Sequence, residues 1–497
     1  MEPPINHSAD NTETAATSLH SPSPISFSKD TIVAVSTPPG TGGIAVVRIS
    51  GPEALDITGS VWRGKNFKGC DSHTAHLGRI VNEAGETLDE VVATLFLAPN
   101  SYTGDDVIEL ACHGSRWIQR EIVNLLIRSG ARAAGPGEFS QRAFINGRID
   151  LAQAEGIIDL IASSSRSAHR LAMLQANGQF SKRLEGLRQQ LIDFASLLEL
   201  ELDFSEEDVE FADRQHLALL ADKVINEVDR LARSYSVGKA FKEGIPVVIA
   251  GQPNAGKSTL LNQLLEEDKA IVSDVPGTTR DIIEDTREID GTLFRFIDTA
   301  GLRETDDSVE RIGIERATDR IRRSAIILWL VDTTSDIETQ LEYIREKQKN
   351  LDSSILQHII FNKIDACKNA DFLSRGIRLL SDNSNSSDSS NNSNPILQLS
   401  ASTGEGIGTL LSALTSDALS MQTEGGDIMV TNARHYESLL RGGESLRRAR
   451  QLLADHLSAD FIAQDVREAL HHLGEITGTI TTSTLLNTIF SRFCIGK

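Results

Sequence analysis

The segment Gly251-Gln-Pro-Asn-Ala-Gly-Lys-Ser258 has the residue types and spacing of a phosphate-binding loop. Its glycines let backbone N–H groups turn toward phosphate oxygens, and Lys257 is placed to reach the β- and γ-phosphates of a nucleotide. Ser258 supplies a hydroxyl for Mg²⁺, and the helix predicted to begin here would direct its N-terminus at the anion. The predicted nucleotide contacts in this loop are Asn254, Ala255, Gly256, Lys257, Ser258 and Thr259.

Three further motifs follow in the order that GTP-binding domains use, and the last of them, Ser400-Ala-Ser402, fits the final guanine-contacting loop. Asp298-Thr-Ala-Gly301 offers a carboxylate for the Mg²⁺ environment and a glycine for the γ-phosphate. In Asn362-Lys-Ile-Asp365, the Asp365 carboxylate can accept hydrogen bonds from N1–H and the 2-amino group of guanine. Adenine would leave that carboxylate unpaired, at a cost of about 1–3 kcal/mol or more. The motifs therefore predict GTP as the nucleotide, with contacts from Asp298, Thr299, Ala300, Gly301, Asn362, Lys363, Asp365, Ser400, Ala401 and Ser402.

The residues expected to catalyse hydrolysis differ from the Ras pattern. Thr279, in Gly277-Thr-Thr-Arg-Asp281, is the expected second hydroxyl ligand of Mg²⁺. Leu302 occupies the position of the water-orienting glutamine and cannot form a hydrogen bond. The side-chain oxygen of Asn254 could instead hold a monovalent cation near the phosphates. Glu310 could orient water, although the residues alone favour a solvated position on a helix for it.

The elements that must position these motifs form an α/β pattern. Short apolar runs alternate with helical segments, which predicts a mostly parallel, doubly wound sheet covered on both faces. These runs are residues 246–250, 293–297, 325–331, 358–361 and 396–399. The predicted Ras-like P-loop GTPase domain spans 241–425. Its Ser/Asn-rich segment 381–394 is expected to be a mobile surface loop, since it has too little apolar surface to offset its ordering entropy.

The segments on both sides of this domain are helical. Leu184, Leu187, Leu191, Phe194 and Leu198 recur at three- and four-residue steps and predict one buried helical face. After residue 430 the same helical spacing of apolar residues occurs again, with Ala463, Val466, Leu470 and Leu473 on one face. The G domain is therefore expected to be inserted into a helical bundle domain formed by residues 148–240 and 426–497.

The N-terminal part has a third sequence pattern, different from that of the G domain and of the helical segments. Apolar, β-branched runs at 31–35, 44–49, 91–97 and 107–111 are mixed with shorter helical stretches and predict a small α+β domain over residues 29–147. Residues 1–28 contain no Lys or Arg and are rich in Ser, Thr, Pro and Asn, which predicts a disordered extension. They fit neither a secretory signal nor a transit peptide, so the expected location is the cytoplasm.

Composition narrows the function classes. The 497 residues carry a net charge of −21, which argues against a protein that coats nucleic acid through bulk electrostatics. No stretch is long and apolar enough for a membrane span. Four scattered cysteines favour a reducing compartment over a disulfide framework. Four arginines on a C-terminal helix form either a local basic patch or a solvated face: Arg441, Arg447, Arg448 and Arg450.

The chain closely resembles the MnmE (TrmE) family of bacterial tRNA uridine-modifying GTPases, within the TrmE-Era-like GTPases, from Asp30 to Lys497. Besides the G motifs, the resemblance is carried by Pro38-Pro-Gly-Thr-Gly-Gly43, Tyr102-Thr-Gly-Asp-Asp106, Pro136-Gly-Glu-Phe-Ser140, Asp150-Leu-Ala-Gln-Ala-Glu155 and Phe493-Cys-Ile-Gly-Lys497. It implies an N-terminal domain like the folate-binding glycine-cleavage proteins, which takes 5-formyltetrahydrofolate or a related folate. The implied folate contacts are Arg48, Glu109, Arg148 and Lys497, where Arg148 replaces a lysine of the family.

The resemblance also implies details of the GTPase cycle. Nucleotide contacts extend over the segment Ser273, Asp274, Val275, Pro276, Gly277, Thr278 and Thr279. Family members are activated by K⁺ and dimerise through their G domains. The K⁺ ligands would be Asn254, Ser273, Val275 and Thr278. The family's water-orienting glutamate corresponds to Glu310, which joins Lys257 and Cys494 as the expected catalytic residues.

The implied function is modification of the wobble uridine, position 34, of certain tRNAs. A homodimer works with an FAD-containing partner, MnmG (GidA), as a heterotetramer that adds an aminomethyl or carboxymethylaminomethyl group at C5. Cys494 is then a nucleophile or a buried inert thiol; its C-terminal context fits a prenylation signal poorly. Two alternatives remain: a regulatory or ribosome-assembly GTPase switch without modification chemistry, and a folate-binding scaffold with a degenerate GTPase. The sequence leaves open which tRNAs are modified and what GTP hydrolysis drives.

Overall fold

The computed structural model describes residues 30–203, 214–266, 285–298, 321–322, 324–367, 396–455 and 457–496. The predicted extension 1–28 and the predicted loop 381–394 lie outside these residues. The chain forms two compact units, one of residues up to Arg148 together with Thr482–Lys497, the other of Ile149–Thr481. Within the described part, no helix is both long and apolar enough to cross a membrane.

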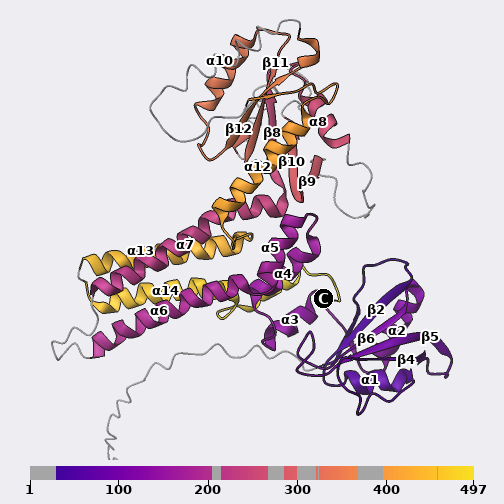
Figure 1. The fold of residues 1–497 in the computed structure, drawn as a ribbon. Coiled ribbons are helices and arrows are strands. Elements are labelled where there is room, and N and C mark those ends of the chain that lie inside the picture. The colour runs from indigo at the N-terminus through magenta and orange to yellow at the C-terminus, as the bar shows by residue number, and fades with distance from the viewer. Residues whose placement is uncertain are drawn as a thin grey trace, which may run out of the picture. The chain divides into compact units, whose positions relative to one another are not determined.

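A seven-stranded sheet forms the first unit, and Figure 1 labels its strands β2, β4, β5 and β6. The strand order is β3-β4-β5-β6-β2-β1-β7. All neighbouring strands are antiparallel except β1 and β7. Buried residues of α1 (Ala54–Val61) and α2 (Arg116–Arg128) pack on one face of the sheet and form its core with inward residues of β2 and β5. The strands are β1 Ile32–Val35, β2 Ile44–Ser50, β3 Trp62–Arg63, β4 Thr74–Val81, β5 Thr87–Phe96, β6 Val107–His113 and β7 Arg132–Ala133. This confirms the predicted N-terminal α+β fold.

The C-terminal segment belongs to this first unit. Helix α15 (Ser483–Phe490) packs against α3 (Glu138–Ile145), and Ile495 forms an isolated antiparallel bridge with Pro136. Residues 482–497 were expected within the helical domain because they follow other residues with a helical pattern. Their contacts instead join them to the N-terminal fold.

Long helices form the first part of the second unit. The predicted apolar face of α6 is buried throughout, because Leu184, Leu187, Leu191, Phe194 and Leu198 contact the facing helices. Helix α13 packs against α7 and α14, and α14 packs against α6, so helices from both sides of the G segment share one core. The helices are α4 Leu151–Ala162, α5 Arg166–Ala176, α6 Gln179–Asp203, α7 Arg214–Glu243, α13 Ala433–Ala454 and α14 Ala459–Thr477.

The G segment of the second unit is a six-stranded sheet in the order β13-β12-β11-β8-β10-β9. All neighbours are parallel except the β9–β10 pair. Two hydrophobic clusters, one with α8 and α12 and the other with α10, cover its faces, as predicted for a doubly wound sheet (Figure 1). The elements are β8 Ile245–Gly251, α8 Lys257–Glu266, β9 Asp285–Ile289, β10 Thr292–Asp298, β11 Ile326–Asp332, α10 Ile337–Gln348, β12 Leu356–Asn362, β13 Ile396–Gln398 and α12 Ile407–Gly425.

Candidate functional site

The phosphate-binding loop joins the end of β8 to the start of α8, as predicted. A Cβ added at Gly251 would lie 2.6 Å from the carbonyl oxygen of Leu330, and Gly251 has a φ of 151°. Gly256 has a φ of 94°, and a Cβ there would overlap the side-chain amide of Asn362. Both positions therefore require glycine. The loop lies at the N-terminus of a ten-residue helix, which suits the phosphates of a nucleotide.

Lys257 lies at the first position of α8 and is folded back over the loop. Its Nζ donates hydrogen bonds to the carbonyl oxygens of Gly251, at 3.2 Å, and Gln252, at 2.9 Å. Next to it, Ser258 is exposed at the helix terminus, where a hydroxyl ligand of Mg²⁺ belongs. Asn254 is also exposed and has a φ of 65°. The three predicted side chains therefore gather around one loop.

Asn362, at the end of β12, ties the phosphate loop to the predicted guanine loop. Its Nδ2 donates to the carbonyl oxygen of Ala255 at 2.8 Å, and its Oδ1 accepts from the backbone N–H of Ala401 at 3.0 Å. The side chain is 1% exposed, so neither bond competes with bulk water. Segments that are more than a hundred residues apart in sequence thus form one site at the carboxyl edge of the sheet.

Sequence reasoning missed Asp332 in this site. Asp332 ends β11, beside β12, and its Oδ2 lies 2.5 Å from Nζ of Lys363, which also donates to the carbonyl oxygen of Asn254 at 2.8 Å. Burial opposes ionisation of Asp332, but Lys363 and Thr334 outweigh it and lower its pKa. Asp332 therefore holds Lys363 across the loop. The only signal for it in the sequence is an acid directly after a fully apolar strand.

Asp365 lies beside the predicted guanine-contacting loop Ser400–Ser402. Its Oδ2 accepts a hydrogen bond from Oγ of Ser402 at 3.3 Å, and the hydroxyls of Ser400 and Ser402 are 2.9 Å apart. A hydrogen bond from Ser400 and further bonds from Ser402 and the local backbone lower the pKa of Asp365. An exposed carboxylate that stays ionised is the acceptor that the guanine edge requires.

Several predicted residues lie outside the described part of the chain. Asp298 is the last residue of β10, directly beside β8, so its backbone reaches the same sheet edge as the phosphate loop. Not described are Ser273, Asp274, Val275, Pro276, Gly277, Thr278, Thr279, Thr299, Ala300, Gly301, Glu310 and Lys497. The proposed Mg²⁺ and K⁺ ligands are thus represented here by Ser258 and Asn254 alone.

A second candidate site lies in the first unit, around Arg48 and Glu109. These residues are direct partners in the register of β2 and β6, and Nη2 of Arg48 lies 2.7 Å from Oε1 of Glu109. The guanidinium also lies over the rings of Tyr102, at 5.2 Å, and Phe139, at 5.6 Å. Carboxylate, guanidinium and flat rings together suit a planar ligand with hydrogen-bonding edges, such as a pterin.

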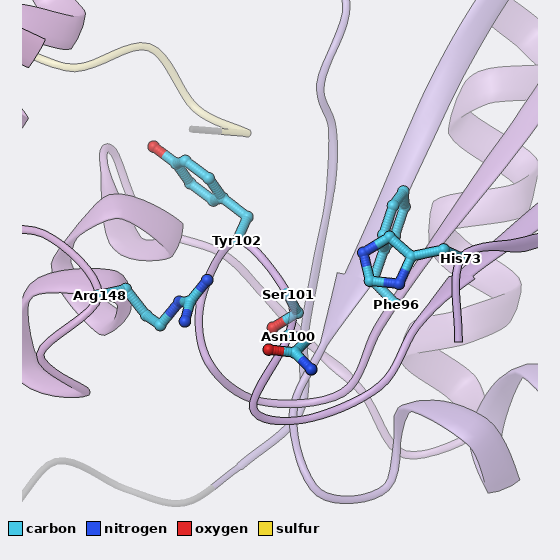
Figure 2. A pocket seen from close by; sticks show the side chains of 6 residues that line it. All are labelled: His73, Phe96, Asn100, Ser101, Tyr102 and Arg148. Carbon is cyan, nitrogen blue, oxygen red and sulfur yellow. The ribbon is translucent and has the colours of Figure 1, made fainter. Parts of the chain in front are cut away.

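Tyr102 also lines a cavity of about 380 Å³ that contains Arg148 (Figure 2). The other lining residues are His73, Phe96, Asn100 and Ser101. The cavity is open and has one cationic group, Arg148, which suits the carboxylates of an extended ligand. Three of the four proposed folate contacts therefore lie around Tyr102, and the fourth, Lys497, is outside the described residues.

Cys494 is exposed in the C-terminal tail, residues 490–496, whereas Cys70 and Cys112 are buried. Burial and the charge of Asp89 raise the pKa of the Cys112 thiol to about 11, so that thiol is unreactive. Among these three, only Cys494 has the exposure that a nucleophile needs.

The four arginines of α13 that were candidates for a basic patch are all paired with carboxylates. Arg441 pairs with Glu437 at 2.5 Å, and Arg450 pairs with Asp222 at 3.0 Å. Arg447 pairs with Asp229, and Arg448 pairs with both Asp465 and Glu468. This helix therefore has no uncompensated basic patch formed by these four residues.

Comparison with known proteins covers nearly the whole chain. The family model described as "MnmE helical domain" matches residues 151–494, and "GTP-binding protein TrmE N-terminus" matches residues 31–148. The chain is 47% identical to the tRNA modification GTPase MnmE of Cytophaga hutchinsonii over 468 residues, which cover 94% of this chain and 98% of that protein. Its counterpart in Parabacteroides distasonis is 46% identical, covering 94% of this chain and all of that protein. Era of Aquifex aeolicus, a solved structure, matches at 25% identity over 40% of this chain and 66% of that chain, with a TM-score of 0.27.

Proposed function

The chain belongs to the MnmE family of tRNA modification GTPases, and we propose that it couples GTP hydrolysis to modification of the wobble uridine of tRNA. The observation that carries the GTPase half of the proposal is the bridge made by Asn362 between the phosphate loop and the Ser400–Ser402 loop. The tRNA half rests on family membership across both units.

Recognition of guanine is assigned to the loops after β12 and β13. Asp365 accepts hydrogen bonds from N1–H and the 2-amino group of the base, and Ser400, Ala401 and Ser402 enclose its other edge. The aliphatic stem of Lys363, held by Asp332, covers one face of the ring. A purine without the two donors leaves an ionised carboxylate unpaired, which gives GTP its preference over ATP.

Hydrolysis is assigned to the loop before α8 and to residues outside the described part. On binding, Lys257 exchanges its carbonyl partners for the β- and γ-phosphate oxygens. Ser258 and Thr279 would hold Mg²⁺, which neutralises phosphate charge. Asn254, Ser273, Val275 and Thr278 would hold K⁺, which supplies the positive charge that an arginine finger provides elsewhere. Glu310 orients the attacking water, since Leu302 cannot.

Binding of the one-carbon donor is assigned to the first unit. Arg48, Glu109, Arg148 and Lys497 bind a formyltetrahydrofolate, with its ring system at Arg48–Glu109 and its carboxylates toward Arg148. Cys494 acts from the tail beside this site. An MnmG-type partner, in a heterotetramer with a homodimer of this chain, supplies FAD, and the product is an aminomethyl or carboxymethylaminomethyl group at C5. The complex acts in the cytoplasm.

A GTPase that acts only as a switch needs neither the Arg48–Glu109 site nor an exposed Cys494. Both features therefore favour the modification enzyme over a ribosome-assembly switch. Folate binding by calorimetry separates the two functions, since a switch would bind none. A degenerate GTPase is disfavoured by the close-fitting glycine cradle around Lys257.

The decisive experiment is GTP hydrolysis by the purified full chain in KCl and in NaCl. We expect turnover at least about tenfold faster in K⁺, equivalent to about 1.4 kcal/mol of barrier. Asn254→Ala should remove the difference between the two salts while Asp352→Asn, on an exposed turn before β12, keeps it. Equal turnover of the wild type in both salts would contradict cation-assisted hydrolysis.

A further inference from the structure

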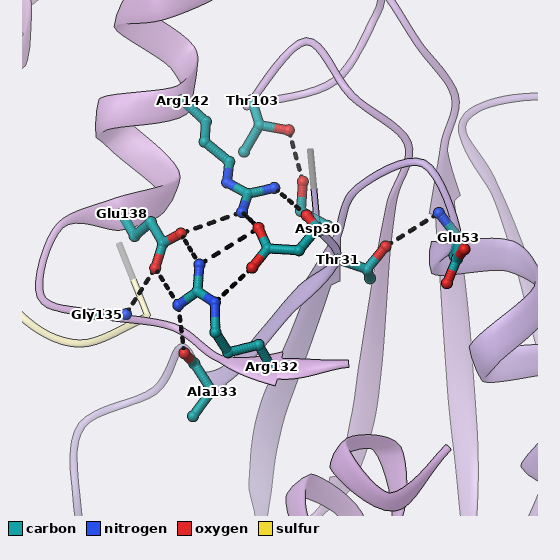
Figure 3. Close-up of polar contacts among 10 residues, drawn as sticks. Asp30, Thr31, Glu53, Thr103, Arg132, Ala133, Gly135, Glu138 and Arg142 are labelled. Atoms are coloured by element: carbon teal, nitrogen blue, oxygen red, sulfur yellow. Dashed lines mark hydrogen bonds and ion pairs between the residues drawn. The ribbon is translucent and has the colours of Figure 1, made fainter. Parts of the chain in front are cut away.

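Four charged residues of the first unit form a cluster with no part in the proposed chemistry: Asp30, Arg132, Glu138 and Arg142 (Figure 3). Arg132 contacts Asp30 at 2.5 Å and Glu138 at 2.6 Å. Arg142 contacts the same two carboxylates, at 2.8 Å and 3.1 Å. Each cation thus contacts both anions, which fixes the geometry more tightly than isolated pairs do. We call these residues the charge cluster.

The charge cluster forms hydrogen bonds with the backbone at the end of β7 and in the turn that follows it. Oε2 of Glu138 accepts a hydrogen bond from the backbone N–H of Gly135 at 2.9 Å. Nη1 of Arg132 donates to the carbonyl oxygen of Ala133 at 2.9 Å. Arg142, whose side chain is 10% exposed, donates to the carbonyl oxygen of Asp30 at 2.6 Å. The cluster therefore determines the path of the chain from Ala133 to Gly137.

This turn is the surface on which the C-terminal tail lies. Pro136 forms a β-bridge with Ile495, and the backbone N–H of Gly137 donates to the carbonyl oxygen of Cys494 at 3.4 Å. A Cβ at Gly137 would lie 2.5 Å from the carbonyl oxygen of Phe490 and 2.9 Å from Cβ of Phe493. The tail therefore packs directly on the backbone of the turn.

The opposite side of the tail is anchored at Gly496. Its carbonyl oxygen accepts hydrogen bonds from Oγ of Ser36 at 3.1 Å and from Nη1 of Arg48 at 3.4 Å. A Cβ at Gly496 would overlap the carbonyl oxygen of Val35. With Phe493 buried before it and Gly496 anchored after it, Cys494 has a fixed backbone and an exposed side chain.

We propose that the charge cluster is a positioning device for the C-terminal tail, and that it sets the place of the Cys494 thiol two residues before the Gly496 carbonyl that Arg48 contacts. Its four members are positioning residues, since they act through the turn and the tail. Glu138→Gln replaces the carboxylate acceptor of the Gly135 N–H with a neutral amide oxygen and removes one shared anion from both arginines. The proposal that this placement serves catalysis rests on the proposed function, but docking of the tail can be measured without it.

The first test measures docking on the full-length protein. Variants Glu138→Gln and Arg142→Met are compared with Glu83→Gln, which removes an exposed carboxylate paired with Arg128 in the same unit. We expect carboxypeptidase to release tail residues about tenfold faster from the two cluster variants, since local opening exposes the tail. The rate of alkylation at Cys494 should also change in the two cluster variants and stay unchanged in Glu83→Gln. Rates within about twofold of the wild type would overturn the proposal.

The second test measures whether placement matters for modification. With tRNA, folate and an FAD-containing partner, the cluster variants should modify tRNA about tenfold more slowly while GTP hydrolysis by the other unit stays within about twofold. Normal modification with an undocked tail would overturn the positioning role. A wild type that modifies no tRNA would refute the proposed function instead, and the docking test would still decide whether the cluster holds the tail.

Discussion

Asp365 is the residue on which nucleotide specificity most directly depends. Replacing it with Asn turns one acceptor oxygen into an amide donor, which faces the 2-amino group of guanine. Asp365→Asn should therefore weaken GTP binding by about 100-fold, or about 2.7 kcal/mol. Xanthine has a carbonyl at C2, so the amide matches it, and the variant should gain affinity for XTP. Titration of the full chain with fluorescent GTP and XTP measures both changes.

Asp352→Asn is the matched control for this substitution. Asp352 carries the same carboxylate, but it accepts from the backbone N–H of Ser354 on the turn before β12, at the opposite edge of the sheet. The affinities of Asp352→Asn for GTP and XTP should equal those of the wild type. If Asp365→Asn bound GTP and XTP in the wild-type ratio, Asp365 would have no role in reading the base.

The parts of the site that could be predicted from the sequence are its contiguous motifs. The phosphate loop and Asn362–Asp365 are recognisable because each motif is a short run with fixed spacing. Asp332 escaped prediction because its role depends on β11 lying beside β12, which is a property of strand order. The Arg48–Glu109 pair depends likewise on the register of β2 and β6. The residues alone do not specify that register, and only the family resemblance indicated the pair.

At the scale of elements, Glu155 joins three helices. From α4 it contacts His435 of α13 at 2.5 Å and Arg434 at 2.8 Å, and Arg434 donates to the carbonyl oxygens of Glu475 and Ile476 near the end of α14. Burial opposes ionisation of Glu155, yet His435 and Arg434 outweigh it and lower its pKa to about 2. The carboxylate therefore stays charged inside the bundle.

Glu155→Gln should lower the free energy of unfolding at pH 7 by about 3–5 kcal/mol, because it leaves a buried guanidinium without its anion. Since the folded pKa lies below the ordinary value of 4.5, the stabilisation is complete above pH 4.5 and is lost as the pH falls toward 2. The gap between wild type and variant should close over that window. Urea unfolding followed by helical circular dichroism at several pH values checks this.

The exposed pair of Glu437 and Arg441 on α13 provides the control. Glu437→Gln should change the free energy of unfolding by less than about 1 kcal/mol, since exposed pairs contribute little. A gap between wild type and Glu155→Gln that stayed constant from pH 7 to pH 3 would show that the stabilisation does not come from the ionised carboxylate.

Elements were predictable where periodicity is strong. The apolar runs 246–250 and 325–331 became β8 and β11 within one residue at each end, and the α6 face was buried as its spacing required. The two-residue strands β3 and β7 are too short to show alternation. The place of α15 depends on contacts such as the Pro136–Ile495 bridge, across more than 350 residues, which no local period encodes.

At the scale of the whole molecule, the net charge of −21 must be reconciled with a tRNA substrate. The obvious basic candidates are Arg441, Arg447, Arg448 and Arg450 of α13, yet each is paired with a carboxylate. An arginine that stays paired with a carboxylate neutralises no phosphate, so it displaces no condensed cation from the tRNA. The basic surface for tRNA therefore has to come from other residues of this chain or from the proposed partner.

The double variant Arg447→Gln, Arg450→Gln should therefore keep the tRNA affinity of the full chain within about twofold. Two lost phosphate contacts would instead reduce the slope of log affinity against log salt by about 1.4–1.8. Fluorescence anisotropy with labelled tRNA over a KCl series measures both quantities. The converse variant, Asp222→Asn with Asp229→Asn, releases the same two arginines and should bind tRNA more tightly at low salt only. A large loss of affinity in the arginine variant would place tRNA on α13 and would mean that the ion pairs open when it binds.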